Sequence, residues 1–304
     1  MKVFVTGVNG QLGHDCLNNL HRRGHQVIGS GSAVKYTGIQ DGSAVTSAAY
    51  APLDITERDA VRATLEKLRP DAVIHCAAWT AVDAAERVEN RERVEAVNHL
   101  GTRYLAEAAQ GIGAKMLYIS TDYVFDGTGN QPWRPEEQAF APLNHYGKTK
   151  LEGEFAVREL LDKYFIVRIS WVFGLNGGNF VKTMLRVGKT CDSVRVVNDQ
   201  IGTPTYTGDL APLLADMVES ERYGVYHATN EGGYISWYDF CGEIYRQCGL
   251  RSTIIPVSTA EYGRTEATRP LNCRLDKAKL TEAGFRRLPP WHEALRRYLK
   301  EAGL

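Results

Sequence analysis

Short runs of branched apolar residues alternate with longer amphipathic stretches in the first half of the chain. Such runs are typical of buried parallel strands, and they lie at residues 3–6, 26–29, 72–75 and 116–120. Residues 57–68 and 91–110 carry apolar side chains at spacings of three and four, which predicts a helix over each range. Strands that alternate with helices indicate βαβ units, so we predict an α/β fold with a Rossmann-like, doubly wound parallel sheet.

The alternation loosens after residue 170, where glycine and proline interrupt the pattern. They stand at Gly174, Gly177, Gly178, Pro204, Pro256 and Pro270. We therefore expect a dinucleotide-binding Rossmann domain over residues 1–170 and a smaller, mainly substrate-binding part over residues 171–304. Residues 206–220 and 225–228 resemble one further helix and strand, and this segment could rejoin the main sheet.

A glycine-rich loop follows the first predicted strand, where TGVNGQLG occupies residues 6–13. Gly7, Gly10 and Gly13 allow a tight turn and let backbone N–H groups approach a pyrophosphate, whose negative charge a helix N-terminus stabilises. The motif alone is a weak signal, because ordinary turns also contain glycine. The strand before it and the helix that starts inside it favour a dinucleotide.

The end of the second predicted strand indicates which dinucleotide is expected. In the common fingerprint an acidic residue there binds the ribose 2′-hydroxyl, but this strand ends in IGSGS at residues 28–32, without a carboxylate. Ser30, Ser32 and Lys35 could accept a 2′-phosphate, or they could be solvated loop residues. We therefore expect a slight preference for NADPH, with NADH as the alternative, and a shift toward NADH in a Ser30→Asp variant.

A tyrosine and a lysine stand four residues apart in the sequence YGKTK at residues 146–150. If a helix begins near Tyr146, Lys150 lies on the same helix face. A phenol has an ordinary pKa of about 10, and a fixed cation beside it favours the phenolate and eases proton exchange with a substrate oxygen. This spacing is also common on amphipathic surface helices. Together with the glycine loop, it predicts nicotinamide-dependent redox chemistry.

The composition of the 304-residue chain narrows the partners. Its 36 basic and 36 acidic residues cancel without forming a basic block, which argues against nucleic acid and an anionic membrane surface. A small molecule is therefore the expected partner. No run of eighteen apolar residues occurs, so we expect a cytoplasmic protein. Six cysteines without a Cys-x-x-Cys pair fit reduced thiols. Eight histidines show no ligand spacing, so we expect no catalytic metal.

Seven motifs follow one another in a characteristic order along nearly the whole chain. They are GQLG (10–13), LDI (53–55), AAWTAVD (77–83), STDYVF (120–125), YGKTK (146–150), SWVFG (170–174) and DQIGTPT (199–205). In these motifs the chain resembles the extended short-chain dehydrogenase/reductases and, within them, the dTDP-4-dehydrorhamnose reductases. The resemblance implies hydride transfer from NAD(P)H to the C4 ketone of dTDP-4-dehydro-β-L-rhamnose, a nucleotide-diphosphate sugar. The resemblance is also compatible with a homodimer.

The resemblance also implies residue roles. Thr121 would bind the reacting carbonyl, Tyr146 would donate the proton, and Lys150 would hold the nicotinamide ribose as well. The implied cofactor-binding residues are Gly7, Asn9, Gly10, Gln11, Leu12, Gly13, Ser30, Asp54, Ile55, Ala77, Ala78, Trp79, Thr80, Asn98, Tyr146 and Lys150. The implied substrate-binding residues are Val124, Trp171, Asn179, Phe180 and Arg269. Ser120 competes with Thr121, and a surface salt bridge is an alternative role for Arg269.

Several features depart from the family pattern or leave its function open. Cys273 stands where serine is usual, and residues 29–52 form a longer connection than usual, for which we expect a surface excursion or mobile loop. Some bacterial members of the family hold a magnesium ion at a dimer contact through acidic residues. This chain offers only the single carboxylate of Asp15 after the glycine loop, which is weak evidence for such a site. A nucleotide-sugar epimerase or dehydratase, or a non-catalytic NADP-binding regulatory subunit, are the alternative functions, because fold alone does not establish activity.

Overall fold

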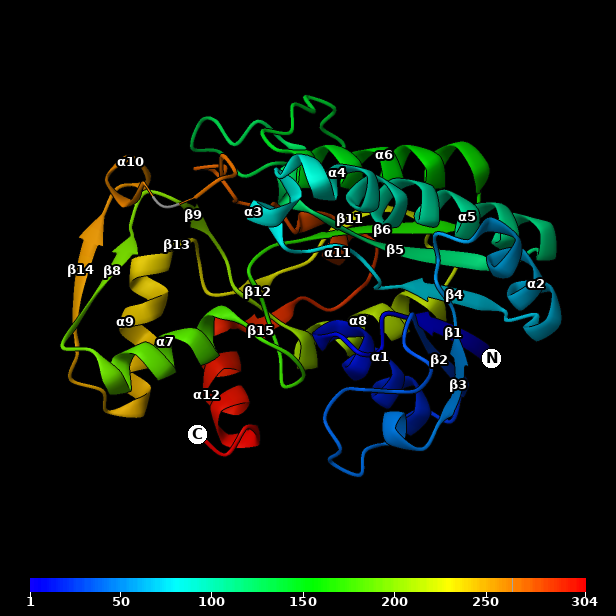
Figure 1. Cartoon of the computed structure of the whole chain (residues 1–304), viewed down its shortest axis with the longest axis horizontal. Helices are drawn as coiled ribbons and strands as arrows, with labels where there is room; N and C mark the ends of the chain where they lie inside the picture. Colours follow the sequence, from blue (N-terminus) through cyan, green and yellow to red (C-terminus); the bar gives the residue numbers. More distant parts are fainter. Residues whose placement is uncertain (264) are drawn as a thin grey trace.

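The computed structural model describes residues 1–263 and 265–304. Its centre is a seven-stranded sheet in the order β11-β6-β5-β4-β1-β2-β3 (Figure 1). Each neighbouring pair in it is parallel. The strands are β1 (Lys2–Thr6), β2 (Gln26–Gly31), β3 (Ala49–Pro52), β4 (Ala72–His75), β5 (Lys115–Thr121), β6 (Tyr164–Ile169) and β11 (Gly224–His227). This is the doubly wound parallel sheet that the alternating pattern predicted.

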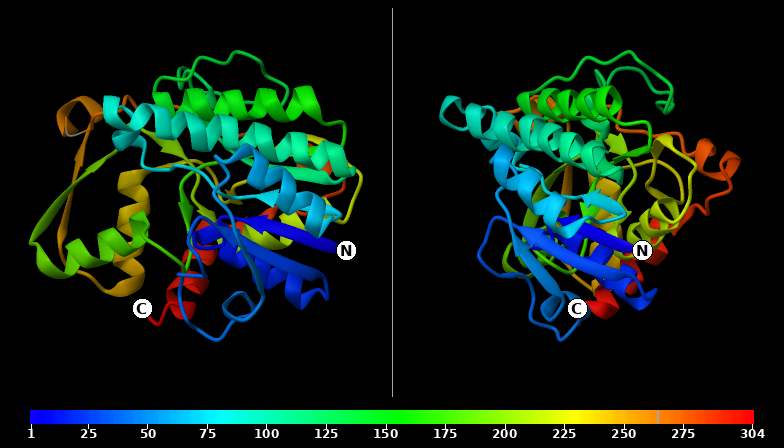
Figure 2. Two further views of the ribbon diagram at one scale, coloured as in Figure 1. Left: turned by 45° about the vertical axis from the view of Figure 1, so that its right-hand side comes forward. Right: turned by 90° about the vertical axis from the view of Figure 1, so that its right-hand side faces the viewer.

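Helices cover both faces of the sheet (Figures 1 and 2). One layer contains α1 (Gln11–Arg22) and α8 (Thr207–Val218), and the other contains α2 (Arg58–Leu68), α5 (Gly101–Ile112) and α6 (His145–Leu160). Side chains alternate between the two faces along a strand. Val3 and Val5 accordingly lie in the apolar cluster beneath α1 and α8, whereas Phe4 between them lies in the cluster beneath α2 and α5. Apolar residues therefore occupy consecutive positions in β1.

The helix predicted over residues 91–110 is divided in the structure. Two α-helices, α4 (Val88–Glu95) and α5, are joined by a π-helical turn, η2 (Ala96–Leu100). A short helix, α3 (Val82–Ala85), precedes them. Single π turns inside helices are frequent at functional sites, and η2 carries the buried Asn98.

Small elements build the remainder of the second half. Four two-stranded sheets pair β7 with β10, β8 with β14, β9 with β13 and β12 with β15. The strands are β7 (Val172–Phe173), β8 (Ser193–Val197), β9 (Ile201–Gly202), β10 (Thr205–Tyr206), β12 (Asn230–Glu231), β13 (Ile235–Ser236), β14 (Thr253–Val257) and β15 (Leu288–Pro290). The helices are α7 (Phe180–Thr190), α9 (Trp237–Cys248), α10 (Thr259–Tyr262), α11 (Ala278–Glu282) and α12 (Trp291–Glu301). Helix α8 and strand β11 belong to the central sheet and its helix layer, so the chain returns to the main sheet after residue 170. The division into two domains at residue 170 stays a prediction.

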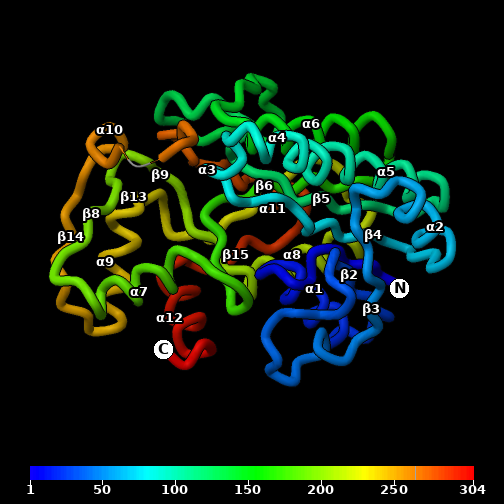
Figure 3. Tube along the Cα trace, viewed as in Figure 1, coloured from blue at the N-terminus to red at the C-terminus, as the bar shows by residue number. Residues whose placement is uncertain are grey.

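Residues 29–52 hold more structure than the expected loop. They contain a 3₁₀ turn, η1 (Ala44–Thr46), and the edge strand β3, which pairs with β2. Figure 3 shows this blue segment curving out beside α1 before it returns to the sheet. Tyr36 and Val45 are buried in the cluster beneath α1. The segment is the surface excursion that was one of the two expectations, but the strand at residues 49–52 was not predicted, because a proline and small residues weaken the strand signal there.

None of the helices within residues 1–263 and 265–304 is long and apolar enough to cross a membrane.

Candidate active site

A cleft of about 890 Å³ opens where the parallel strands β1, β2, β4, β5 and β6 end. Open α/β sheets bind ligands at this edge. The cleft is lined by the three predicted catalytic residues and by every predicted cofactor residue except Asn98. The fold therefore brings together side chains that lie up to 143 positions apart, from Gly7 to Lys150.

The glycine loop packs so closely against its surroundings that no side chain fits at Gly7 or Gly13. Gly7 has a φ of 71°, and a Cβ atom there would lie 2.6 Å from the backbone nitrogen of Ala77. A Cβ atom on Gly13 would lie 2.4 Å from the carbonyl oxygen of Gly7. Helix α1 begins at Gln11 directly behind this turn, so its first N–H groups face the cleft wall. This arrangement fits the pyrophosphate of a dinucleotide.

The end of the cleft beside the last residues of β2 contains both serine and arginine side chains. Ser30 is fully buried, and its Oγ atom has no hydrogen-bond partner among the described residues, so a ligand atom could satisfy it. Ser32 is exposed and lines the cleft, whereas Lys35 is exposed and does not. Arg93 lines the cleft and forms a 3.0 Å ion pair with Asp54. The cation near this end of the cleft is therefore Arg93, which sequence reasoning missed, and not Lys35.

The predicted proton donor lies at the start of α6. Asn144 caps this helix by accepting a 2.8 Å hydrogen bond from the Gly147 N–H, which places Tyr146 in the first turn. Burial raises the pKa of Tyr146 to about 12, although a hydrogen bond with Thr121 acts in the opposite direction. The expectation that a neighbouring ammonium would bring this pKa down was wrong. Enclosure outweighs the other influences, so Tyr146 is a protonated donor at neutral pH.

Thr121 ends β5 beside Tyr146. Its hydroxyl donates to Oδ1 of Asp122 at 3.1 Å and accepts from the Tyr123 N–H at 3.2 Å. The competing residue, Ser120, also lines the cleft, and its hydroxyl donates to Oε1 of Glu154 at 2.6 Å. Because both hydroxyls donate to a carboxylate, the choice of Thr121 over Ser120 stays a prediction.

Lys150 is buried in a polar pocket behind Tyr146. Its Nζ atom donates to the carbonyl of Ile119 at 2.7 Å and lies 4.1 Å from the ring centroid of Tyr118. Burial lowers the pKa of Lys150 to about 7, and the negative charge of Glu154 opposes this shift. The Lys150 ammonium therefore loses its proton near neutral pH.

His75 lies beneath the same pocket. It is held between the hydroxyls of Thr6 at 2.8 Å and Thr102 at 3.0 Å. Burial and the nearby Lys150 lower its pKa to about 3, so His75 is neutral at physiological pH. A neutral imidazole leaves Lys150 as the cation of this pocket.

Asn98 supports the cleft from behind. Its side chain accepts from the Trp79 N–H at 2.8 Å and donates to the Trp79 carbonyl at 3.2 Å. It also donates to the hydroxyl of Thr149 at 3.1 Å. Because Asn98 is buried and does not line the cleft, its contacts join the Trp79 loop to the helix that carries Tyr146 and Lys150.

A buried ion pair fastens α6 to the sheet. Arg168 on β6 donates to both carboxylate oxygens of Glu154 at 2.8 and 2.7 Å, and both side chains are fully buried. The guanidinium lies 5.0 Å from the ring centroid of Phe125 and 5.1 Å from that of Phe140. With the Ser120 hydroxyl as a third partner, this network fixes the helix of Tyr146 against the strand of Thr121.

Of the five predicted substrate residues, only Trp171 lines the cleft. Val124 is fully buried in an apolar cluster, and Asn179 caps α7 by accepting from the Lys182 N–H. Phe180 packs against the Trp237 ring. Arg269 forms two hydrogen bonds to Asp83 at 3.0 and 2.7 Å. Their substrate contacts stay predictions, and the salt bridge of Arg269 matches the alternative role considered for it.

Several residues of the cleft were not predicted from the sequence. Asp122 is buried, and burial raises its pKa to about 6. Tyr123, Cys76 and Trp237 line the cleft as well. Asp122 and Tyr123 lie in the STDYVF motif and could have been found there, whereas no local pattern marks Trp237.

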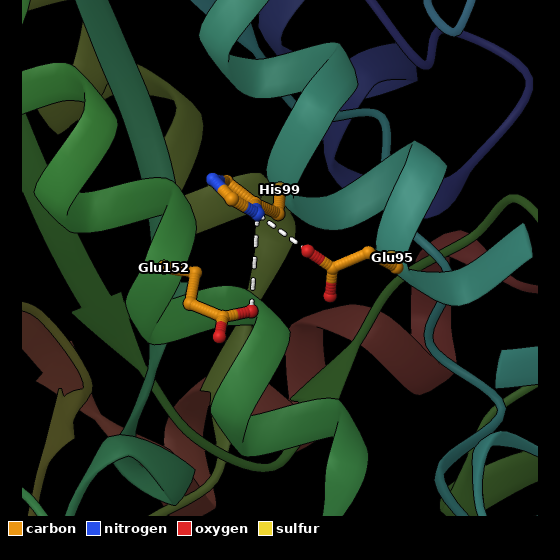
Figure 4. Close-up of side chains that lie close together, drawn as sticks. All are labelled: Glu95, His99 and Glu152. Carbon is orange, nitrogen blue, oxygen red and sulfur yellow. Dashed lines mark hydrogen bonds and ion pairs between the residues drawn. The ribbon is translucent and has the colours of Figure 1, made fainter. Parts of the chain in front are cut away.

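Among residues 1–263 and 265–304, one group of potential metal ligands lies outside the cleft. Glu95, His99 and Glu152 approach one another between η2 and α6, with His99 Nδ1 2.5 Å from Glu95 Oε1 and 3.9 Å from Glu152 Oε2 (Figure 4). None of the three lines the cleft. Burial and the neighbouring Glu95 raise the pKa of Glu152. Glu95 ends α4, His99 lies in η2 and Glu152 lies in α6, so the contacts link α4 and η2 to α6.

Comparison with known proteins gives a consistent result. The family model described as RmlD substrate binding domain matches residues 1–303. The spore coat polysaccharide biosynthesis protein SpsK of Bacillus subtilis is 39% identical over 300 residues, which cover 99% of this chain and 97% of that protein.

Two solved structures share the whole fold. A dTDP-4-dehydrorhamnose reductase from Clostridium acetobutylicum superposes with a TM-score of 0.89 at 39% identity, and the match covers 100% of both chains. A dTDP-4-dehydrorhamnose reductase from Bacillus anthracis, solved in complex with NADP, gives a TM-score of 0.87 at 38% identity over 99% of both chains. The chain therefore belongs to the RmlD substrate binding domain family.

Proposed function

We propose that this protein is an NAD(P)H-dependent oxidoreductase that reduces the C4 ketone of dTDP-4-dehydro-β-L-rhamnose to dTDP-L-rhamnose. The observation that carries this proposal is the meeting of Thr121, Tyr146 and Lys150 with the glycine loop in one cleft. The solved relatives that share 38% to 39% of the sequence are named for this reaction, which supports the same substrate here.

The residues of the cleft divide the chemical work. A bound nicotinamide cofactor would supply the hydride. Thr121 and Tyr146 hydrogen-bond the ketone oxygen, and the Tyr146 proton passes to this oxygen as negative charge develops on it. Removing one such preorganised donor typically lowers turnover by about two to three powers of ten. A Tyr146 pKa of about 12 keeps the proton on the phenol until charge on the substrate oxygen draws it away.

Lys150 serves two purposes in this proposal. Its ammonium stabilises the phenolate that remains after proton transfer, and Lys150 would also help to hold the nicotinamide ribose of a bound cofactor. Both roles need the charged form of Lys150, whose pKa burial lowers to about 7.

The cofactor preference depends on the adenosine end of the cleft. We propose that NADPH is used at least as well as NADH, because Ser30 and Ser32 leave a 2′-phosphate unrepelled and Arg93 lies at the same end. The relative from Bacillus anthracis was solved with NADP, which agrees with this assignment.

An absorbance assay tests the proposed function against its alternatives. Purified protein is mixed with NADPH and dTDP-4-dehydro-β-L-rhamnose, and cofactor oxidation is compared with the amount of dTDP-L-rhamnose formed. A reductase oxidises one cofactor for each sugar, an epimerase or dehydratase returns the hydride and shows no net oxidation, and a regulatory subunit shows neither. The Tyr146→Phe protein is the matched control for contaminating reductases.

Location in the cytoplasm and assembly as a homodimer are further parts of this proposal. Light scattering after size-exclusion chromatography would give the mass of the assembly. A mass of a single chain, 33.8 kDa, would contradict the homodimer.

A further inference from the structure

Two tryptophans stack face to face in the cleft. The ring centroids of Trp171 and Trp237 lie 3.8 Å apart, with an angle of 16° between the rings. Trp171 follows β6 of the main sheet, whereas Trp237 begins α9 in the second half of the chain. Both side chains line the cleft that contains Tyr146. The stack therefore joins the wall beside the catalytic residues to the substrate part.

The backbone of Trp171 has an unusual conformation. Its φ of 50° lies in the left-handed region, which bulky residues rarely adopt. Hydrogen bonds hold the chain on both sides, since the Thr205 N–H donates to the Trp171 carbonyl at 3.1 Å and the Thr205 hydroxyl donates to the Ser170 carbonyl at 2.6 Å. Such conformations persist where the surrounding structure fixes them, and they gather at ligand sites. The indole of Trp171 is thus directed into the cleft by its main chain.

The Trp171 indole packs against Gly202, where the absence of a side chain makes room for the ring. A Cβ atom on Gly202 would lie 3.0 Å from Cε2 of Trp171 and 2.9 Å from the Cβ atom of Cys273. Any larger residue there must displace one of the two side chains. Gly202 therefore offers a second position from which the Trp171 ring can be moved.

Trp237 is itself firmly held. Ser236 caps α9 in a capping box with Asp239, whose N–H donates to the Ser236 hydroxyl at 3.0 Å. The Phe180 ring at the start of α7 packs against Trp237 with a centroid separation of 4.6 Å. Trp237 can therefore act as a fixed support on which the Trp171 indole rests.

We propose that Trp237 is a positioning residue of the nucleotide-sugar site. Its indole holds Trp171 by stacking, and the pair presents a flat apolar wall against which the sugar ring of the substrate packs. This inference rests on the proposed function for the identity of the sugar. Flat aromatic rings suit this role because pockets for small ligands combine apolar walls with a few placed polar groups. Here the polar groups are Thr121 and Tyr146.

The consequence for catalysis is orientation. If Trp237 no longer supports Trp171, the sugar loses its fixed distance from the Tyr146 hydroxyl, and a misplacement of about 1 Å can cost about a hundredfold in rate. We expect Trp237→Leu, which keeps apolar bulk without a flat ring, to lower kcat/KM by about tenfold to a hundredfold. Trp237→Phe, which keeps a flat ring, should retain kcat/KM within a few-fold. The dissociation constant of NADPH should stay unchanged in both variants.

Circular dichroism tests the stack without relying on activity. Two indoles at this separation couple excitonically and give a pair of bands of opposite sign. This signal should disappear in Trp237→Phe and Trp237→Leu, and it should persist in Trp291→Phe, because Trp291 does not line the cleft. Titration of the parent with dTDP-L-rhamnose should change the signal.

Several results would overturn the inference. A folded Trp237→Leu protein with kcat/KM within twofold of the parent would do so, as would a dichroism signal that dTDP-L-rhamnose leaves unchanged. If Trp237→Leu does not fold, the Trp237→Phe protein and the titration of the parent decide the matter. A parent protein that does not reduce dTDP-4-dehydrorhamnose would contradict the proposed function instead. The titration is then repeated with UDP-glucose, and a signal unchanged by either nucleotide sugar overturns the aromatic wall.

Discussion

One side of the cleft presents mainly main-chain atoms, whereas the other side presents aromatic side chains. The glycine side, formed by the loop at residues 7–13 and by Ala77, presents main-chain atoms packed so closely that a Cβ atom on Gly7 or Gly13 would overlap its neighbours. The aromatic side, formed by Tyr123, Tyr146, Trp171 and Trp237, presents side chains. Backbone surfaces suit the part of a ligand that never varies, whereas side chains can be exchanged singly. We therefore expect cofactor binding to depend on the glycine side and substrate choice on the aromatic side.

The largest expected effect comes from the proton donor on the aromatic side. Tyr146→Phe should lower turnover by about two to four powers of ten, because general acid catalysis is lost while the ring remains. The dissociation constant of NADPH, measured by fluorescence titration, should stay within a few-fold of the parent. Turnover within a few-fold of the parent in steady-state assays would rule out Tyr146 as the proton donor.

A substitution on the glycine side should have the converse effect. Gly13→Ala would place a Cβ atom 2.4 Å from the Gly7 carbonyl oxygen, so the loop must open and NADPH affinity should fall by more than tenfold. Gly111→Ala is the matched control, since a Cβ atom in this helical position meets nothing within 4 Å. Cofactor titration of both variants checks the prediction, and equal affinities would show that close packing is not what the cofactor requires.

The charge of Lys150 links the two sides through pH. Its pKa of about 7 means that the ammonium is present below this pH and is lost as the pH rises through it. The dissociation constant of NADPH should therefore increase above about pH 7 in the parent, and Lys150→Met should bind weakly at every pH. Lys150→Arg keeps a charge throughout, so its affinity should not depend on pH in this range. A pH dependence that persists in Lys150→Arg would assign the titration to another group.

The smallest expected effect concerns the 2′-phosphate. Ser32→Asp should shift preference from NADPH toward NADH by up to about tenfold, because a carboxylate repels the phosphate and can accept from a free 2′-hydroxyl. Ser30→Asp is expected to shift it in the same direction but at a cost in stability, since Ser30 is fully buried. Steady-state kinetics with both cofactors decide this, and an unchanged preference in Ser32→Asp would place the phosphate elsewhere.

How far each side could be predicted from sequence follows from how it is built. The glycine side is local, because one turn between a strand and a helix requires G-x-x-G-x-x-G, so Gly7, Gly10 and Gly13 could be placed directly. Trp237 reaches the cleft through the packing of α9, and Arg93 through the short helix α4, which no spacing reveals. The pKa of Tyr146 was misjudged for a similar reason. Its burial depends on residues distant in sequence, whereas the Lys150 spacing is local.

Elements of the fold show the same distinction. Strands with consecutive branched apolar residues, such as β1 and β4, were predicted because both of their faces are buried. The edge strand β3 was missed, since a strand covered on fewer sides needs fewer apolar residues. The π turn η2 was also missed, because one extra residue in a turn barely disturbs the apolar spacing of residues 91–110.

The buried pair of Arg168 and Glu154 constrains how this protein can change over evolutionary time. Replacing Glu154 alone would strand the Arg168 charge in the core, at a cost of about 3 to 5 kcal/mol, which is a large share of the stability of a typical domain. Replacing Arg168 alone would leave Glu154 with the partly exposed Arg158, 3.4 Å away, as its remaining ion pair. Replacing both with apolar residues of similar volume could be nearly neutral. A lineage that loses Glu154 must therefore lose Arg168 before it or almost together with it. Until then, the strand of Thr121 and the helix of Tyr146 are inherited as a single unit.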